Sequence, residues 1–224
     1  MNLKGLYLVT PDYMDDGIFD IVRISIEHGA SILQYRDKSN NYTRKIYAGK
    51  KFRKIADEYN IPLIVDDDPV LMDIIDADGI HIGRDDVPFD YIKGKYPDRI
   101  IGVSTYGDIK KAKEYEKLGA DYVAFGSFFS TETKKDATLC DINILNDIGG
   151  IKIPVFVIGG INLNNLEELL KYKISGVAVV SSIFSSSDPA ESTISYMNKL
   201  KQYGKISKAC IKVKNCQLLS MHLF

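Results

Sequence analysis

An apolar run near the middle of the chain ends abruptly in a loop that combines glycine, hydroxyl groups and lysine. Gly126 opens the loop, and hydroxyls follow at Ser130, Thr131 and Thr133, with an ammonium group at Lys134. Freed backbone amides, hydroxyls and an ammonium group can together bind phosphate oxygens. Loops of this composition are more often plain solvated connections. The prediction of a phosphate site therefore depends on polar residues elsewhere in the chain.

A second set of polar residues follows another apolar run at every second position. It comprises Gln34, Arg36 and Lys38, and in a strand such residues point the same way. Arginine makes forked contacts with a polyanion, and lysine acts as a point charge. The same residues could instead form a structural ion network with Asp37 or with a neighbouring strand.

Acidic clusters end two further apolar runs. One runs from Asp66 through Asp67 to Asp68, and the other is Asp85 and Asp86. Mg2+ binds through one or two carboxylates together with phosphate oxygens and water. We therefore expect a magnesium site that uses at least one carboxylate from each cluster, while Asp68 and Asp86 also fit helix N-caps.

Three other segments carry polar or glycine residues at predicted strand ends. His81 is more consistent with a hydrogen-bonded core side chain than with a catalyst. Gly159 and Gly160, together with Val180 and Ser181, would let backbone amides approach a phosphate monoester. The alternative is that these glycines only make tight turns.

The elements that must position these residues alternate regularly. Eight short segments rich in Ile and Val have the pattern of buried parallel strands. They are Gly5 to Thr10, Ser31 to Arg36, Pro62 to Asp66, Gly79 to Ile82, Ile100 to Ser104, Tyr122 to Gly126, Val155 to Ile158 and Gly176 to Val180. Helical patterns between them include Ile18 to His28, Tyr42 to Tyr59, Ile109 to Leu118 and Leu163 to Tyr172. Eight such units predict a (β/α)8 TIM barrel, an α/β fold whose reactive groups lie where the strands end.

The length, composition and charge of the chain limit the number of domains and the kinds of partner expected. The 224 residues are 45% hydrophobic, which suits one barrel domain over residues 1–204 and a C-terminal extension over residues 205–224. We expect that extension to be poorly ordered or an added helix, with a partner contact as the alternative. The net charge of -1 argues against nucleic acid or a membrane as a partner. With three cysteines and no apparent signal peptide, a cytoplasmic location is expected, and a homodimer is possible.

The order and number of these motifs resemble the thiamine-phosphate synthase family over Leu6 to Phe184. The resemblance is carried by Tyr7-Leu8-Val9-Thr10, Gln34-Tyr35-Arg36-Asp37-Lys38, Ala77-Asp78-Gly79-Ile80-His81-Ile82-Gly83, Gly102-Val103-Ser104-Thr105, Gly119-Ala120-Asp121-Tyr122-Val123, Thr131-Glu132-Thr133-Lys134, Ile158-Gly159-Gly160-Ile161 and Gly176-Val177-Ala178-Val179-Val180-Ser181. It implies a transferase that joins 4-amino-2-methyl-5-hydroxymethylpyrimidine pyrophosphate to thiazole phosphate, with Mg2+ as cofactor and two phosphorylated small molecules as substrates.

The resemblance also implies a role for each matching residue. Gln34 would contact the pyrimidine, and Asp66 would be among the substrate-binding residues. Arg36, Lys38 and Lys134 would bind pyrophosphate, and Asp67 and Asp86 would bind magnesium. Ser104 would lie near the reacting carbon and act in catalysis with Arg36 and Lys134. Thr131 and Thr133 would contact the thiazole, and Gly160, Val180 and Ser181 its phosphate.

Several positions depart from the family pattern. Asp66 stands where Asn is usual, and its carboxylate would repel pyrophosphate unless it joins the metal or carries a proton. Ser127 and Ser130 replace prolines, Tyr106 replaces a frequent histidine, and Arg84 replaces a common Gln. Two alternatives stay open: a thiazole tautomerase, which typically has a histidine in the loop that here follows Gly126, and a non-catalytic paralogue that binds thiazole phosphate.

Overall fold

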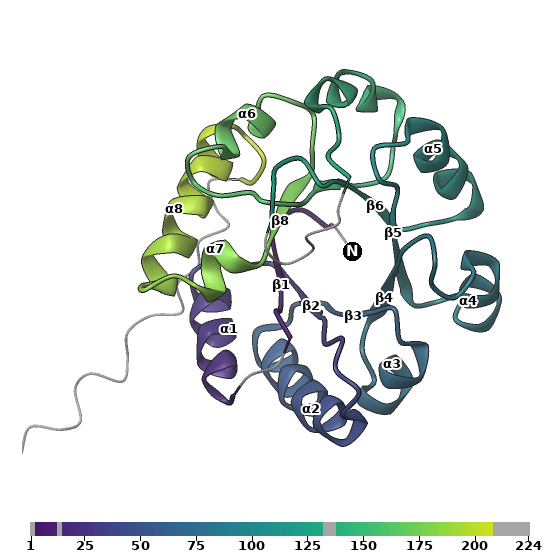
Figure 1. Cartoon of the computed structure of the whole chain (residues 1–224), viewed down its shortest axis with the longest axis vertical. Coiled ribbons are helices and arrows are strands. Elements are labelled where there is room, and N and C mark those ends of the chain that lie inside the picture. The colour runs from purple at the N-terminus through teal and green to yellow at the C-terminus, as the bar shows by residue number, and fades with distance from the viewer. Residues whose placement is uncertain (1–2, 13–14, 132–137, 208–224) are drawn as a thin grey trace, which may run out of the picture.

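Eight parallel strands close into a barrel in the order β1 to β8 (Figure 1). The computed structural model describes residues 3–12, 15–131 and 138–207. The strands are β1 Gly5–Val9, β2 Ile32–Tyr35, β3 Leu63–Asp66, β4 Gly79–Ile82, β5 Ile100–Ser104, β6 Tyr122–Phe125, β7 Val155–Val157 and β8 Gly176–Val179. The predicted TIM barrel is confirmed, and the predicted strand ends agree to within one residue.

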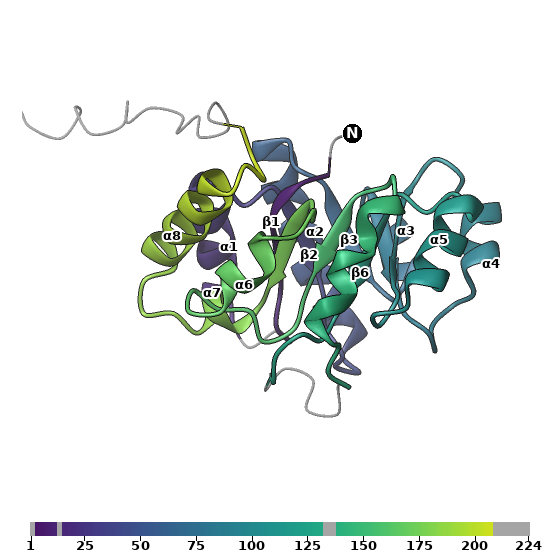
Figure 2. The same cartoon turned by 90° about the horizontal axis from the view of Figure 1, so that it is seen from above.

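Helices surround the barrel as an outer ring (Figures 1 and 2). They are α1 Gly17–Glu27, α2 Tyr42–Tyr59, α3 Pro69–Ile75, α4 Phe89–Lys95, α5 Ile109–Leu118, α6 Leu166–Leu170, α7 Ser181–Phe184 and α8 Pro189–Gln202, and two 3-10 turns span Ile142–Asn146 and Ile148–Gly150. The predicted helix from Leu163 is shorter at both ends. Asparagine side chains compete for the backbone there, because Asn162 Oδ1 accepts a hydrogen bond from Asn164 N at 2.9 Å.

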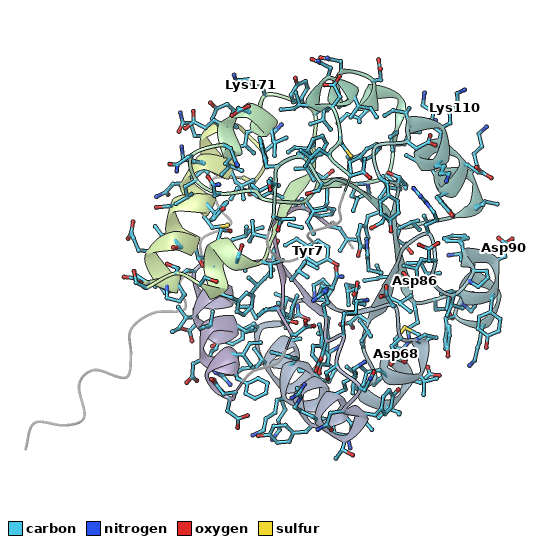
Figure 3. The ribbon with its side chains drawn as sticks, in the orientation of Figure 1. Tyr7, Asp68, Asp86, Asp90, Lys110 and Lys171 are labelled. Atoms are coloured by element: carbon cyan, nitrogen blue, oxygen red, sulfur yellow. The ribbon has the colours of Figure 1, made fainter. Side chains whose placement is uncertain are left out.

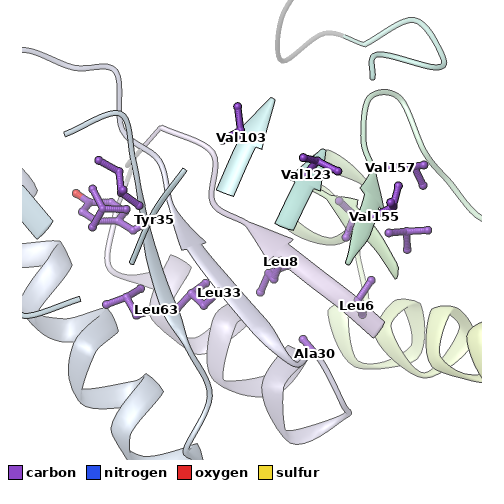
Figure 4. Packing of buried hydrophobic residues seen from close by; sticks show 14 of the residues in the cluster. Leu6, Leu8, Ala30, Leu33, Tyr35, Leu63, Val103, Val123, Val155 and Val157 are labelled. Carbon is purple, nitrogen blue, oxygen red and sulfur yellow. The ribbon is translucent and has the colours of Figure 1, made fainter. Parts of the chain in front are cut away.

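The core has two layers, because successive strand side chains alternate in direction. Outward-facing residues such as Leu8, Leu33, Val123 and Val157 are fully or almost fully buried against the helices (Figure 4). Inward-facing residues fill the barrel itself, and the principal members of this inner cluster are Tyr7, Val9, Ile32, Ile64, Tyr122 and Phe156. The outer layer packs the strands against the helices, and the inner layer fills the barrel interior below the carboxyl ends of the strands.

A glycine determines how the inner layer is filled. Tyr122 pairs with Gly102 on the neighbouring strand, and a Cβ on Gly102 would lie only 1.9 Å from Cζ of the Tyr122 ring. The ring can therefore cross the barrel, where it makes edge contacts with Tyr7 and Phe156 at centroid distances of 5.8 and 5.6 Å. Gly102 thus places a tyrosine hydroxyl in the centre of the barrel.

The chain end beyond α8 also contacts the barrel. Ile206 is buried in the outer core, and Lys205 Nζ donates to the backbone oxygen of Tyr172. The rest of the predicted extension, residues 208–224, lies outside the described residues. Within the described ranges, no helix is long and apolar enough to span a bilayer.

Replacing Gly102 with alanine should destabilise the barrel. The added methyl group would collide with the Tyr122 ring, and overpacking of this kind costs about 1–3 kcal/mol. We expect the Gly102→Ala variant to lose about 2 kcal/mol or more in the free energy of unfolding, measured by urea denaturation. Gly94 in α4 is the matched control, since a Cβ there meets nothing within 4 Å. An equal loss for Gly94→Ala and Gly102→Ala would contradict the packing argument.

Candidate active site

A cavity of about 640 Å³ opens at the carboxyl ends of the strands. It brings together residues that are far apart in sequence, and each predicted site residue within the described ranges lines it. These residues are Gln34, Arg36, Lys38, Asp66, Asp67, Asp86, Ser104, Thr131, Gly160, Val180 and Ser181. Figure 3 shows Tyr7 and Asp86 inside the ring of helices, whereas Asp90 and Lys110 lie at its periphery. Thr133 and Lys134 fall outside the described residues, and the individual roles stay predictions.

The cations predicted to bind pyrophosphate are paired with carboxylates. Lys38 Nζ lies 2.8 Å from Asp66 Oδ2 and also contacts Asp67 Oδ2. Arg36 Nε lies 3.9 Å from Asp66 Oδ2, and Arg36 Nη1 donates to Asp12 Oδ1 at 3.1 Å. Two of these carboxylates, Asp66 and Asp67, lie at the end of the neighbouring strand β3. The ion network with a neighbouring strand, one of the two alternatives expected from the sequence, is therefore present. Asp66 therefore sits among cations, which offsets the repulsion expected from its charge.

Asp37 does not belong to this cluster. Its side chain is fully buried, and Arg44 Nη2 lies 3.8 Å from Asp37 Oδ2. The alternation along this segment therefore places Arg36 and Lys38 in the cavity and turns Asp37 away from it.

Two residues after β1 hold the segment that carries Arg36 and Lys38. Thr10 Oγ1 donates to the backbone oxygen of Arg36 and accepts from its backbone nitrogen, both at 2.9 Å. Asp12 Oδ1 accepts from the backbone nitrogen of Lys38 at 2.8 Å. Sequence reasoning assigned no role to Thr10 or Asp12. Their position at the end of the first predicted strand and just beyond it was the available signal, because neighbouring parallel strands end side by side.

The two carboxylates predicted to bind magnesium both reach the cavity. Asp67 follows β3 with a positive φ of 61°, and Asp86 Oδ2 accepts from the backbone nitrogen of Gly83 at 2.6 Å. Asp86 is not the N-cap of α4, which is Pro88, whereas Asp68 caps α3, since its Oδ1 accepts from the backbone nitrogens of Val70 and Leu71. Across the described residues no cluster of three potential protein ligands is assembled. Two carboxylates fit Mg2+ only where substrate oxygens and water complete the shell.

A chain of hydrogen bonds runs from the barrel interior to the cavity. The Tyr7 and Tyr122 hydroxyls are 2.7 Å apart, and Tyr122 OH lies 3.0 Å from His81 Nδ1. His81 Nε2 lies 2.8 Å from Ser104 Oγ. Burial lowers the pKa of His81 and raises that of Tyr122, so the imidazole is neutral and both phenols stay protonated. His81 is a hydrogen-bonded interior residue, and it orients the Ser104 hydroxyl.

The contact between Ser104 and His81 does not make a hydrolytic nucleophile. A serine nucleophile needs a base that accepts its proton and a third group, usually a carboxylate, that stabilises the resulting imidazolium. Here the third group is the Tyr122 hydroxyl, and burial of His81 disfavours its charged form. The geometry suits a hydroxyl held for hydrogen bonding to a ligand.

The loops after β6 and β7 contact each other at the other side of the cavity. Gly160 has a φ of 62°, and a Cβ there would lie 2.3 Å from the Ser130 carbonyl oxygen. Ser127 replaces an expected proline, yet it fixes its own loop: its Oγ donates to the Phe129 oxygen at 2.9 Å, and its carbonyl accepts from Cys140 N at 2.7 Å. Loop packing alone therefore requires a glycine at position 160.

Two further departures from the family pattern contact each other. The Arg84 guanidinium lies 4.8 Å from the centroid of the Tyr106 ring, a distance at which cation–π attraction operates. Both residues line the cavity. The arginine at position 84, where Gln is common in the family, therefore packs against the tyrosine at position 106, where histidine is frequent.

The barrel, with cations and carboxylates gathered at the carboxyl ends of its strands, defines a TIM-barrel enzyme suited to phosphorylated ligands. The family model described as Thiamine monophosphate synthase matches residues 6–183. A thiamine-phosphate synthase from Picrophilus torridus is 60% identical over 90% of this chain and 99% of its own length. One from Thermoplasma acidophilum is 50% identical over 84% of this chain and 88% of its own.

Solved structures agree with this match. Thiamine phosphate pyrophosphorylase from Pyrococcus furiosus superposes with a TM-score of 0.81 at 33% identity, covering 90% of this chain and 98% of that one. A 3-hexulose-6-phosphate synthase, at 16% identity and a TM-score of 0.64, shares the fold alone. The chain belongs to the thiamine monophosphate synthase family, and it is a transferase of thiamine biosynthesis.

The buried imidazole should leave a signature in acid stability. Because the pKa of His81 is lowered in the folded protein, the unfolded chain takes up this proton at a higher pH than the folded protein does, beginning near about 6.5. Stability contributed by the neutral ring is therefore lost as the pH falls through that range. We expect His81→Gln to reduce the slope of unfolding free energy against pH by up to about 1.4 kcal/mol per pH unit.

Urea denaturation at several pH values between 4.5 and 7.5, chosen about the ordinary histidine pKa, would measure this slope. His28 at the end of α1 lies outside the barrel interior, so His28→Gln is the matched control for the loss of a histidine elsewhere in the fold. Equal slopes for the unmodified protein and His81→Gln would show that the imidazole is not held neutral by burial.

Proposed function

We propose that the cavity joins 4-amino-2-methyl-5-hydroxymethylpyrimidine pyrophosphate to thiazole phosphate, releasing thiamine phosphate and pyrophosphate. The observation that carries the proposal is the joint placement of Arg36, Lys38, Asp67 and Asp86 in one cavity of a chain 60% identical to a thiamine-phosphate synthase. Cations and carboxylates together suit a pyrophosphate leaving group that carries a divalent metal.

The reaction is an alkyl transfer. The bond between the methylene carbon of the pyrimidine and the pyrophosphate oxygen breaks, and both electrons leave with pyrophosphate. The nitrogen lone pair of the thiazole then forms the new bond to the methylene carbon. No enzyme nucleophile is needed, so the protein acts by aligning the two substrates and by stabilising the departing charge.

Arg36 and Lys38 are proposed to bind the departing pyrophosphate. Each is held near the cavity by a carboxylate partner, Asp12 for Arg36 and Asp66 with Asp67 for Lys38. An incoming pyrophosphate offers oxygens that compete for these same donors, and Arg36 can present two of them at once. Lys134, assigned from the sequence alone, is proposed to bind the same pyrophosphate.

Asp67 and Asp86 are proposed to hold Mg2+ against the substrate. When bound, the ion would neutralise charge on the pyrophosphate as it leaves. Asp86 is fixed by the backbone of Gly83, and Asp67 contacts Lys38. Displacement of the Lys38 ammonium from Asp67 would free a carboxylate for the ion and a cation for pyrophosphate.

The second substrate is proposed to occupy the side of the cavity formed after β6, β7 and β8. Thr131, with Thr133 from the sequence, would contact the thiazole, and Gly160, Val180 and Ser181 would bind its phosphate. Ser104, held by His81 at 2.8 Å, would hydrogen-bond the pyrimidine side near the reacting carbon. We also propose a cytoplasmic location, because the low cysteine content suits a reducing compartment.

The tautomerase alternative needs a proton shuttle in the cavity. His81 is the one histidine among the described residues that line the cavity, and both of its nitrogens are engaged by Tyr122 and Ser104. A shuttle must pass through the charged imidazolium near neutral pH, and burial, which lowers the pKa of His81, disfavours that form. Transfer of the pyrimidine group is therefore the better supported function.

Formation of thiamine phosphate by the purified protein should require Mg2+. Loss of either proposed ligand removes a carboxylate that holds the charge-neutralising ion, so we expect Asp67→Asn and Asp86→Asn to lower kcat/KM by about 100-fold. The measurement is chromatographic detection of thiamine phosphate from both substrates, with Mg2+ or with EDTA.

Asp90→Asn is the charge-matched control, because Asp90 lies on the exposed first turn of α4. It should keep kcat/KM within about twofold, as surface changes away from a site usually do. Full activity in EDTA would contradict the magnesium proposal, and absence of product from the unmodified protein with Mg2+ would contradict the function.

A further inference from the structure

We infer that Tyr122, together with Tyr7, fixes the direction of the hydrogen-bond chain in the barrel interior, so that the Ser104 hydroxyl keeps its own proton for the cavity. Ser104 then donates to the oxygen through which pyrophosphate leaves the reacting carbon. Tyr122 is a positioning residue, because it acts on Ser104 through His81. The direction of the chain needs no ligand, whereas the role of its last proton rests on the proposed function.

The hydrogen-bond chain depends on a glycine between two of its members. His81 on β4 and Tyr122 on β6 both pair with Gly102 on the strand between them. Because position 102 carries no side chain, the two rings stack at a centroid distance of 5.6 Å. Ser104 lies two residues after Gly102 on β5 and shares its inward face. The chain is therefore built from three neighbouring strands and ends at Tyr7 on β1.

The inner end of the chain is closed to solvent. Tyr7 is 1% exposed and Tyr122 is fully buried. Their hydroxyl oxygens are 2.7 Å apart, and among the residues that the structure describes the Tyr7 hydroxyl has no other hydrogen-bond partner. Each phenol has one proton to donate, and a buried donor without an acceptor is costly. The Tyr7 proton is therefore donated to the Tyr122 oxygen.

This first donor sets every later one. With the Tyr7 proton on its oxygen, Tyr122 donates its own proton to His81 Nδ1 at 3.0 Å, and Nδ1 must then be unprotonated. A neutral imidazole carries its proton on the other nitrogen, so His81 Nε2 donates to Ser104 Oγ at 2.8 Å. The Ser104 proton is left for the cavity, which Ser104 lines.

The reverse direction leaves a buried proton without an acceptor. If Ser104 donated to His81 Nε2, the Nδ1 proton would go to Tyr122 and the Tyr122 proton to Tyr7. The Tyr7 proton would then have no acceptor in the described part of the chain. A charged imidazolium would donate from both nitrogens and leave the same proton unpaired. One direction alone uses every interior proton, so the two phenols fix the tautomer of His81.

A hydroxyl that keeps its proton can stabilise a growing negative charge. In the proposed reaction this charge grows on the oxygen that departs with pyrophosphate, and the family resemblance places Ser104 near the reacting carbon. A donor already directed at that oxygen binds the transition state more tightly than the substrate. The hydrogen bonds behind Ser104 strengthen its donation, because consecutive hydrogen bonds polarise one another. Loss of the Tyr122 hydroxyl should therefore affect kcat more than KM.

NMR of the protein with isotope-labelled histidine tests the direction without any ligand. Spectra that correlate the carbon-bound ring protons with the ring nitrogens show which nitrogen is protonated, and His81→Gln identifies the His81 signals. We expect the unmodified protein to carry the proton on Nε2 alone. Tyr122→Phe removes the donor to Nδ1, so the Nδ1 resonance should move to that of a nitrogen that accepts no hydrogen bond.

Kinetics of the same variant test the role of the Ser104 proton. We expect Tyr122→Phe to lower kcat for thiamine phosphate formation about tenfold, the effect of about one hydrogen bond, and to leave KM within about twofold. Tyr96→Phe is the matched control, because Tyr96 is also buried and its hydroxyl donates to Asp73 Oδ2 at 2.6 Å, away from the cavity. It should keep both the His81 spectrum and kcat.

A proton on Nδ1, on both nitrogens or shared between tautomers in the unmodified protein would overturn the inference, even if Tyr122→Phe does not fold. An unchanged Nδ1 resonance or an unchanged kcat in folded Tyr122→Phe would also overturn it, as would an equal loss of kcat in Tyr96→Phe. The expected His81 spectrum without any product would overturn the proposed function and leave the direction of the chain standing. Product from a protein with the other tautomer would overturn the inference alone.

Discussion

The carboxylate of Asp66 stands where the apolar barrel interior gives way to the charged mouth of the cavity. On one side it accepts from the buried amide of Gln34, and on the other it faces the ammonium of Lys38. A carboxylate is costly to bury without such partners. The cation that would bind pyrophosphate and the amide that would contact the pyrimidine are therefore placed by the same residue, at the last position of β3.

The polar groups beneath this cluster depend on a different constraint. A glycine at position 102 lets the Tyr122 ring cross the barrel, and the Tyr122 hydroxyl then contacts both Tyr7 and His81. Burial keeps the imidazole neutral, since it lowers the pKa of His81. The Ser104 hydroxyl is consequently positioned from below by the barrel core, whereas Arg36 and Lys38 are positioned from the side by the loop after β1.

Much of this arrangement could be predicted from the sequence. The alternation of Ile- and Val-rich segments with amphipathic ones predicted the barrel, and strand ends then predicted which polar residues share a cavity. The spacing of Gln34, Arg36 and Lys38 placed all three in it while Asp37 turned away. The resemblance to a known family added the substrates, which no spacing could supply.

Other features could not be predicted because they depend on contacts between distant residues. The partners of Asp66 come from β2 and the segment after it, more than twenty-five residues earlier in the chain, so its tolerance beside pyrophosphate could not be judged from its own neighbours. The contact between Asp12, which follows β1, and Arg36, which follows β2, could not be predicted for the same reason. Nor could the contact between Arg84 and Tyr106. The sequence was compatible with a helix N-cap at both Asp68 and Asp86, and of the two only Asp68 caps a helix.

A crystal structure of the protein with Mg2+, pyrophosphate and thiamine phosphate would test the central claim most directly, that Asp66 holds Gln34 while the cations turn to pyrophosphate. The account predicts that Lys38 leaves Asp67 for a pyrophosphate oxygen, that Asp66 keeps its contact with Gln34, and that the pyrimidine lies against Gln34. A structure in which Asp66 binds the metal and has released Gln34 would contradict it.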